Sequence, residues 1–238
     1  MTLVEISLVL VAVVAGSLVQ GTIGFGLALV VVPVIGLIEP ALLPATMLIL
    51  SFPLTLWMAL NERTAVDLRG VAHMIPARIV GTGAGAWVVG VASLDELSIV
   101  IGVTIVIAVL ISGLTPDFEL GIRSRVTAGV MSGFMGTAAG IGGPPLAIAY
   151  QRKSGPELRS TLAATFVIGT LISLAALAIA GETEAVHLTT ALQLLPGLIV
   201  GLALSTRLRG RLGATWLRPA VLTFAGLSGL AAIVKGLT

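Results

Sequence analysis

The sequence predicts an all-α polytopic membrane protein with two inverted repeats, each a broken or re-entrant helical hairpin plus three transmembrane helices. Three observations lead to this prediction. The chain of 238 residues is 57% hydrophobic and only 10% charged, whereas a soluble domain carries roughly 25% charged residues. Glycine-rich segments interrupt two long apolar runs at corresponding places in the two halves. Basic residues gather in some of the connections between runs and are absent from others.

The apolar runs follow one another with short polar connections, and the mean hydropathy of the chain is +1.12. Most runs reach the roughly 20 residues that a spanning helix needs. No connection is long enough for a soluble domain, so residues 1–238 are expected to form a single membrane domain. In chain order the runs are expected at Leu3–Ile38, about Ala41–Leu60, about Val71–Val91, Ser93–Leu114, Val126–Tyr150, Ser154–Ala180, about His187–Thr206, and from the basic loop Arg207–Arg218 to near Val234.

Capping signals and polar stretches indicate where the runs begin. Ser93 and Ser154 each stand three residues before a glutamate, Glu96 and Glu157, which is the capping-box pattern of a helix N-terminus. The longest polar stretch, Thr115–Arg125, is the expected boundary between a first repeat, 1–118, and a second repeat, 119–238.

Two glycine-rich breaks stand out inside apolar runs. Gln20–Gly26 interrupts the first run, and Gly136–Pro145 interrupts the run from Val126 to Tyr150. Glycine weakens a helix and leaves peptide groups uncovered. Uncovered peptide groups are tolerated at membrane depth only where protein or a water-filled cavity surrounds them. Two such breaks in corresponding places therefore predict a binding site.

The order of breaks, prolines and polar loops repeats in the two halves, which predicts an internal duplication. The first matches share an offset of 116 residues, as between Gly24 and Gly140, and the later ones an offset of 120, as between Gly81 and Gly201. One four-residue insertion around Arg152–Gly155 would account for the change of offset.

The placement of basic residues predicts the topology. If every run crossed the membrane once, the basic loops would fall on both sides, against the positive-inside rule. The conflict disappears if the first and fifth runs each enter and return to the same side. Every basic loop is then cytoplasmic, both termini lie outside, and the halves are inverted, as in many secondary transporters. The basic groups are Arg63/Arg69, Arg123/Arg125, Arg152/Lys153/Arg159 and Arg207/Arg209/Arg211/Arg218.

Each break is expected to start a half-helix, near Ile23–Gly26 and near Ile141–Pro145. The free N–H groups and the positive macrodipole end of a helix start suit an oxyanion. The alternative interpretation is that the glycines are contacts between packed helices. The predicted substrate-binding residues are Gln20, Gly21, Thr22, Gly24, Phe25, Gly26, Arg78, Thr137, Gly140, Gly142, Gly143 and Pro144.

Arg78 is the charged residue deepest inside an apolar run. An arginine at a helix centre costs roughly 2.5–3.5 kcal/mol on insertion scales. The side chain therefore either neutralises an anionic substrate or snorkels to the membrane surface, since seven residues from the start of the run is about 10 Å.

The motifs Gly21-Thr22-Ile23-Gly24-Phe25-Gly26 and Gly136 to Pro145, with Gly-Ile-Gly-Gly-Pro-Pro, resemble those of the sulfite exporter TauE/SafE family. The resemblance covers nearly the whole chain and implies a transporter of sulfite, sulfonates and related sulfur-containing anions in a bacterial cytoplasmic membrane. The first motif has Gly26-Leu27-Ala28 where the second has Gly142-Gly143-Pro144. The resemblance therefore leaves the symmetry of the site and the substrate itself open.

Other function classes are weaker or remain open. The sequence has no cysteine, no His-Glu-x-x-His and no Gly-x-Ser-x-Gly, so we expect neither an enzyme nor a metal or other cofactor. Short arginine-rich loops fit a membrane protein better than nucleic-acid binding. The expected partners are a small anion and the lipid bilayer. A carrier of carboxylates or of lipid phosphates is the alternative, because a helix N-terminus suits those groups equally well.

Overall fold

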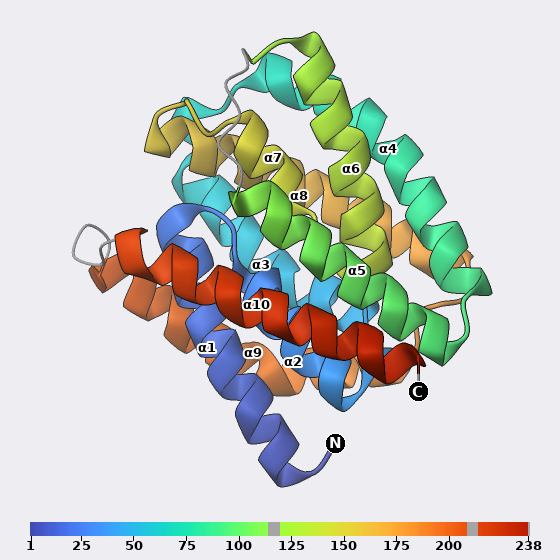
Figure 1. Cartoon of the computed structure of the whole chain (residues 1–238). Helices are drawn as coiled ribbons and strands as arrows, with labels where there is room; N and C mark the ends of the chain where they lie inside the picture. The colour runs from blue at the N-terminus through green and yellow to red at the C-terminus, as the bar shows by residue number, and fades with distance from the viewer. Residues whose placement is uncertain (114–119, 209–213, 238) are drawn as a thin grey trace.

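The computed structural model describes residues 1–113, 120–208 and 214–237, and every regular element within them is helical (Figure 1). This confirms the all-α class. The short turns η1 (Pro40–Leu42) and η2 (Arg63–Ala65) separate longer helices. The α-helices are α1 (Leu3–Ile23), α2 (Leu27–Ile38), α3 (Ala45–Asn61), α4 (Leu68–Val91), α5 (Leu94–Gly113), α6 (Ile122–Ala139), α7 (Gly143–Ala149), α8 (Gly155–Ile179), α9 (Ala185–Leu208) and α10 (Ala214–Leu237).

Within the described ranges, five helices are long and apolar enough to cross a membrane: α1, α4, α5, α8 and most of α9. Shorter apolar segments are α2, α3 and residues Val221–Leu237 of α10. Many large apolar side chains of the long helices face outward, such as Val80 of α4, which is 69% exposed. Such a surface suits lipid and not water, so the chain is a multi-pass membrane protein.

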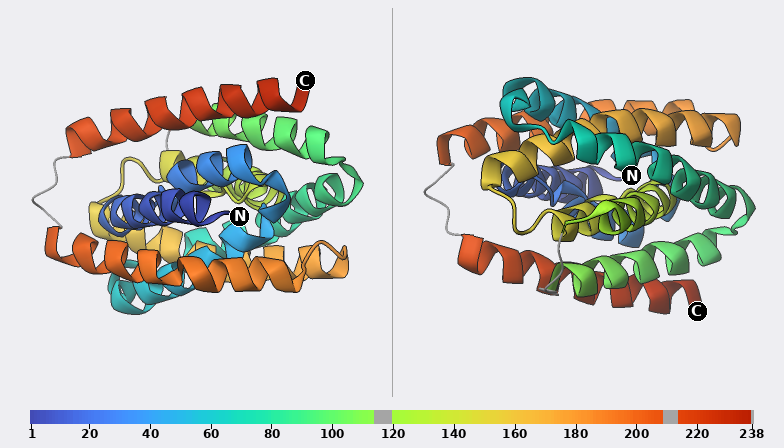
Figure 2. Two further views of the ribbon diagram at one scale, coloured as in Figure 1. Left: turned by 90° about the horizontal axis from the view of Figure 1, so that it is seen from below. Right: turned by 90° about the horizontal axis from the view of Figure 1, so that it is seen from above.

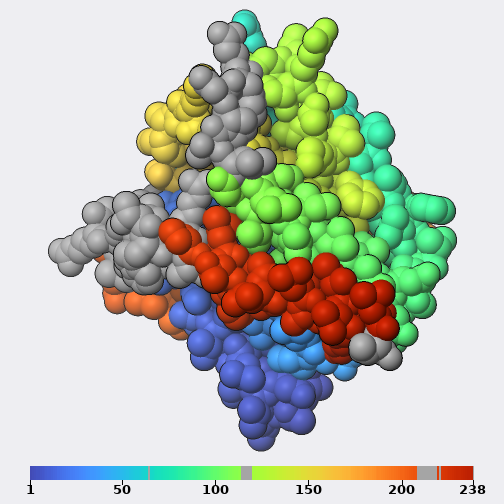
Figure 3. Space-filling model, in the orientation of Figure 1, coloured from blue at the N-terminus to red at the C-terminus, as the bar shows by residue number. Residues whose placement is uncertain are grey.

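The helices lie in three layers (Figure 2). Helices α5 and α10 pack against each other on one face, where they run side by side in the space-filling view (Figure 3). Helices α3 and α8 pack together on the opposite side, flanked by α4 and α9. The broken pairs α1–α2 and α6–α7 fill the middle layer. The glycine-rich breaks are therefore surrounded by protein.

Helix pairs across the middle layer come in matched sets. Helix α4 packs on α6 as α9 packs on α1, and α2 contacts α10 as α7 contacts α5. The closest approaches match as well. A Cβ at Gly81 would collide with the Val130 carbonyl oxygen, and a Cβ at Gly201 would collide with that of Val14. Small residues let the backbones approach at both places.

Both predicted helix starts are present, and the reciprocal bonds of a capping box are formed at the first of them. The Ser93 N–H donates to Oε2 of Glu96 (2.7 Å), and the Glu96 N–H donates to Oγ of Ser93 (3.3 Å). At the second start the Glu157 N–H donates to Oγ of Ser154 (3.3 Å), while the Glu157 carboxylate pairs with Lys153 (3.1 Å).

Three helices begin earlier than the apolar runs indicated. Helix α4 starts at Leu68 and not at Val71, because Oδ1 of Asp67 accepts a hydrogen bond from the Gly70 N–H (2.9 Å) and caps the helix. Helix α6 starts at Ile122 and α10 at Ala214, so first turns that the sequence analysis assigned to loops are helical. The repeat boundary at 118/119 and the loop residues Arg209 and Arg211 lie outside the described residues.

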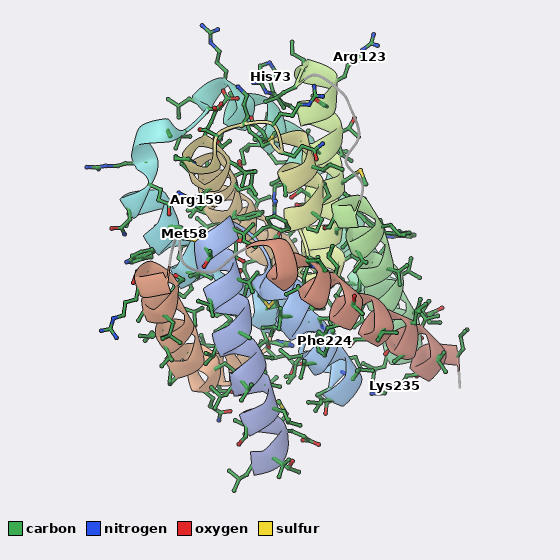
Figure 4. The ribbon with its side chains drawn as sticks, turned by 60° about the vertical axis from the view of Figure 1, so that its left-hand side comes forward. Met58, His73, Arg123, Arg159, Phe224 and Lys235 are labelled. Atoms are coloured by element: carbon green, nitrogen blue, oxygen red, sulfur yellow. The ribbon has the colours of Figure 1, made fainter. Side chains whose placement is uncertain are left out.

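One end of the bundle carries ion pairs between segments that are far apart in sequence. Nη2 of Arg125 lies 2.7 Å from Oδ2 of Asp67, to which the Tyr150 hydroxyl also donates (2.9 Å). Nε of Arg159 lies 2.8 Å from Oε2 of Glu62. We call this the basic end; Arg123 lies there too (Figure 4). Both ends of the α6–α7 pair lie at this end, because Asp67 contacts Arg125 and Tyr150.

The opposite end, which we call the acidic end, has a different character. Met1, Glu39, Glu182, Glu184 and His187 border a cavity of about 610 Å³ there. Met1 precedes α1 and Glu39 follows α2, so the α1–α2 pair also begins and ends at one end of the bundle. Lys235 of α10 donates to the Leu37 carbonyl oxygen (2.9 Å) at this end.

Candidate functional site

The first break has the conformation that its glycines indicated. Helix α1 ends at Ile23, and Gly24 and Gly26 follow with φ of +107° and +129°, where a side chain would be strained. Helix α2 begins at Leu27, whose N–H donates to Oε1 of Gln20 (3.2 Å). The Gln20 side chain therefore bridges the break and occupies one donor of the new helix.

The second break is built differently. Gly140 has φ +77° and ends α6, its N–H donating to the Gly136 carbonyl oxygen (3.0 Å). Gly142 has φ −87°, and α7, which starts at Gly143, is only seven residues long. Pro144 and Pro145 have no N–H to donate. This helix start therefore offers fewer backbone donors than the half-helix prediction assumed.

Both breaks border one small cavity of about 40 Å³ between α2, α3, α4, α6 and α8, which we call the central cavity. A water needs about 10–15 Å³ of such space, so the central cavity has room for on the order of three waters or one compact ion. Its lining residues are Gln20, Phe25, Gly26, Ala28, Leu29, Met47, Leu48, Ser51, Thr55, Arg78, Gly136, Gly140, Ile141, Gly142, Gly143, Pro144, Phe166 and Thr170.

Arg78 supplies the positive charge of the central cavity. It stands near the middle of α4 and is only 2% exposed. Its Nη1 donates to Oγ of Ser132 (2.5 Å), which in turn donates to the Gly142 carbonyl oxygen (2.6 Å). The guanidinium is thus directed at the second break and does not snorkel to an end of the bundle.

Within the described residues Arg78 forms no ion pair with a carboxylate, and its buried Nε has no hydrogen-bond partner. Transfer of an unpaired charge from water into a protein interior costs several kcal/mol. A buried arginine with unused donors on a cavity wall is the arrangement expected of an anion site.

Three glycines make room for the guanidinium. A Cβ at Gly136 would stand 3.0 Å from Nη2 of Arg78, and one at Gly142 would stand 3.3 Å from Nη1. A Cβ at Gly169 of α8 would overlap Nε. Larger residues at these positions would displace Arg78 or fill its space.

Backbone donors add to this charge. Among the described residues, the N–H groups of Gly26, Gly142 and Gly143 donate no hydrogen bond, and all three residues line the central cavity. Buried N–H groups normally have a partner. Free donors from both breaks therefore lie around the space that Arg78 borders.

Eight of the twelve predicted site residues line the central cavity, and four do not. The Thr22 hydroxyl donates to the Leu18 carbonyl oxygen of its own helix (2.7 Å), and Gly21 packs against Ser205. Gly24 lies against Leu158 and Arg159, and the Thr137 hydroxyl pairs with that of Ser173 (2.8 Å). The eight are Gln20, Phe25, Gly26, Arg78, Gly140, Gly142, Gly143 and Pro144.

The sequence reasoning missed Ser132 and Gly169, which hold and accommodate Arg78, and Thr55 and Thr170 in the lining. These are single small or hydroxyl residues inside long apolar helices, with no local pattern that marks them. The described part of the chain has no group of three His, Asp or Glu side chains that would suit a metal ion.

One of three comparisons with known proteins finds a match, and it agrees with the resemblance. No curated protein and no solved structure matches the chain. The family model described as sulfite exporter TauE/SafE matches residues 8–232, nearly the whole chain. This chain therefore belongs to the sulfite exporter TauE/SafE family.

Proposed function

We propose that the protein is a secondary carrier or permease for small sulfur-containing anions, such as sulfite or organosulfonates. The anion binds in the central cavity, near the middle of the membrane, between the two glycine-rich breaks. The observation that carries this proposal is the buried Arg78 guanidinium, which has no carboxylate partner among the described residues. Family membership supports a transporter of this substrate class.

In this proposal Arg78 provides the counter-charge and the breaks provide backbone donors. Hydrogen bonds between charged partners are about twice as strong as neutral ones. The guanidinium offers several donors in one plane, which matches the oxygens of an oxyanion. Gly26, Gly142 and Gly143 let the backbone approach the same ion from both breaks. Arg78 therefore dominates the affinity, and the half-helix starts make a smaller contribution.

The two halves form inverted repeats, 1–118 and 119–238, within one membrane domain. The matched helix pairs support this arrangement, because α4 on α6 corresponds to α9 on α1. The Gly81–Val130 and Gly201–Val14 contacts support it residue by residue, since they join the same positions at the offsets of 120 and 116. Each broken pair enters and leaves at one end of the bundle, which a re-entrant hairpin requires.

The basic end is cytoplasmic and the acidic end faces outward across a bacterial inner membrane. Positive residues favour the cytoplasmic side in membrane proteins. Arg123, Arg125 and Arg159 belong to the basic end, whereas Glu39, Glu182 and Glu184 border the opposite cavity. Cysteine-accessibility labelling in intact cells at positions 123 and 184 would test this orientation. Labelling of both positions from the outside would contradict it.

A binding screen on the purified protein tests the proposed function. Sulfite, methanesulfonate, sulfate, acetate and inorganic phosphate are compared by thermal shift, and the best ligand is then measured by uptake into proteoliposomes. We expect sulfite or methanesulfonate to stabilise the protein most and to be transported. Stabilisation by acetate or phosphate alone would replace the proposal by a carrier of carboxylates or phosphates.

A further inference from the structure

A second and larger cavity adjoins the central cavity. It has a volume of about 300 Å³ and lies between α1, α2, α5, α7, α8 and α10. We call it the side chamber. The two spaces meet at four residues that line both of them, Phe25, Gly26, Leu29 and Pro144. An occupant of the central cavity could therefore extend past these residues into the side chamber.

The lining of the side chamber is mostly apolar. Val19, Ile23, Ile111, Ile148, Val221 and Leu222 contribute to it. The polar lining residues include Gln151 and Lys153, both in the connection between α7 and α8 at the basic end. A passage used only by hydrated ions would be expected to have polar walls, because each ion must keep its water or replace it. These walls suit hydrocarbon.

The two volumes differ in what they can hold. The central cavity, at about 40 Å³, has room for a compact charged head. The side chamber, at about 300 Å³, reaches the lower end of the range of small-molecule pockets. The buried charge of Arg78 thus borders the small space, whereas the large space is mostly apolar, with Lys153 in its lining at the basic end.

We propose that the side chamber binds the hydrocarbon tail of an organosulfonate whose sulfonate head is held at Arg78. The substrate class is therefore the amphiphilic alkanesulfonates, and inorganic sulfite fills only the central cavity. This inference rests on the proposed function of the central cavity. It adds a specificity site formed by residues such as Ile111, Ile148 and Leu222.

A chain-length series tests the inference on the full protein in lipid nanodiscs. Sulfite and methane-, butane- and hexanesulfonate are measured by isothermal titration calorimetry, with protein-free nanodiscs as the blank. Each buried methylene is expected to tighten binding by about fourfold, so butanesulfonate binds up to roughly 60-fold more tightly than methanesulfonate. Equal affinities along the series would overturn the inference and leave the proposed function intact.

A pair of variants on α10 localises the tail. Leu222 lines the side chamber, whereas Leu227 on the same helix is 66% exposed. Leu222→Trp should remove most of the chain-length gain and leave sulfite binding within about twofold of wild type. Leu227→Trp should preserve the whole series. An undiminished gain in Leu222→Trp would contradict the assignment of the tail to this chamber, and if Leu222→Trp does not fold, the wild-type series still decides.

The outcomes separate the two proposals. If none of the four anions binds the wild-type protein, the proposed function falls and this inference falls with it. If sulfite and methanesulfonate bind but longer tails bind no better, only the inference falls. A chain-length gain, together with saturable binding that Arg78→Gln weakens roughly 10- to 100-fold, would support both proposals.

Discussion

The two glycine-rich breaks occupy corresponding places in the halves, yet they carry different chemistry. At the first break Gln20 accepts a hydrogen bond from the Leu27 N–H and so occupies one donor at the start of α2. At the second, Ser132 joins the Gly142 carbonyl to the Arg78 guanidinium. The residue 120 positions after Arg78 is Leu198, which is equally buried, at 2% exposure. The halves therefore share their helix contacts and the positive-φ glycine that ends the first helix of each pair, Gly24 and Gly140. They differ at the next glycine, where Gly26 has φ +129° and Gly142 has φ −87°, and only the first half supplies the charge at the central cavity.

We infer from this difference that the backbone arrangement and the proposed binding chemistry are under separate constraints. Positive-φ glycines and close helix contacts recur in both halves because the turn and the packing require them. A second buried arginine facing the first would repel it across a small cavity of low dielectric. A single cation on one side of the cavity and neutral hydrogen-bond donors on the other side suit a small monovalent anion or a divalent oxyanion.

The largest effect is expected from removal of the Arg78 charge, which only the first half of the chain supplies. Arg78→Gln should lower anion affinity roughly 10- to 100-fold, because hydrogen bonds to charged groups are worth about 1.5–3 kcal/mol. The ligand-free protein should not lose thermal stability, since the variant removes a buried unpaired charge. Titration calorimetry and thermal unfolding measure the two quantities.

Arg69→Gln is the matched control, because Arg69 is an exposed arginine at the start of the same helix. It should bind anions as wild type does. If Arg78→Gln binds anions as tightly as wild type does, Arg78 is not the main source of affinity, and the backbone donors of the two breaks would account for recognition.

A pair of glycine variants should separate binding from folding at the two breaks. Gly142 lines the cavity with φ −87°, which alanine adopts freely, and its Cβ would press on Ser132 and Nη1 of Arg78. Gly142→Ala should therefore weaken binding by about 1–2 kcal/mol, the scale of one disturbed hydrogen bond, with a small change in stability.

Gly24→Ala should have the opposite profile. Gly24 has φ +107° and lies against Arg159, outside the cavity lining. The strain of a side chain there costs about 1–3 kcal/mol of stability, while the folded protein should bind anions normally. Equal binding defects in Gly24→Ala and Gly142→Ala would show that both breaks contact the ion alike.

A third prediction concerns how the α6–α7 pair is anchored at the basic end. Burial raises the pKa of Asp67, but the Gly70 N–H, Tyr150 and Arg125 outweigh it and lower the pKa below its usual value of 3.8. A lowered pKa means that the stabilisation is complete above pH 3.8 and is lost as the pH falls below it. Asp67→Asn should therefore cost about 1 kcal/mol at pH 7 and reduce the loss of stability on acidification.

Thermal unfolding of wild type and Asp67→Asn between pH 2 and pH 7 checks this prediction. Asp95→Asn is the control, because Asp95 is an exposed acid at the start of α5, at the acidic end. A curve for Asp67→Asn that parallels wild type over the whole range would contradict an anchoring role for the Asp67 carboxylate.

The smallest effect is expected at Thr22. Its hydroxyl donates to Leu18 within α1 and does not reach the central cavity, so Thr22→Val should change affinity and stability by less than about 0.5 kcal/mol. A large binding defect in Thr22→Val would place recognition at the first break.

Thr137→Val, which breaks a buried hydrogen bond between the Thr137 and Ser173 hydroxyls, should lower stability by about 1 kcal/mol without loss of anion affinity.

Much of the architecture is determined locally and was predictable from the sequence. The apolar runs predicted the membrane helices, because hydropathy over about 20 residues is a property of the chain itself. Gly24, Gly26 and Gly140 marked the breaks, since positive φ is a local requirement that glycine meets at low cost. Ser93 with Glu96 marked a helix start for the same local reason.

Only the tertiary structure decided which of these residues face the cavity and what Arg78 does. Ser132, Gly142 and Gly169 come from two other helices and a break, and only their packing around α4 turns the guanidinium inward. Thr22 and Phe25 belong to one motif, yet Thr22 bonds to its own helix and Phe25 lines the cavity. The direction of a side chain at a break depends on how the helices before and after the break are oriented. Those helices pack against segments that are distant in the sequence, as α6 does against α4, where Arg78 contacts Ser132 across more than 50 residues of chain.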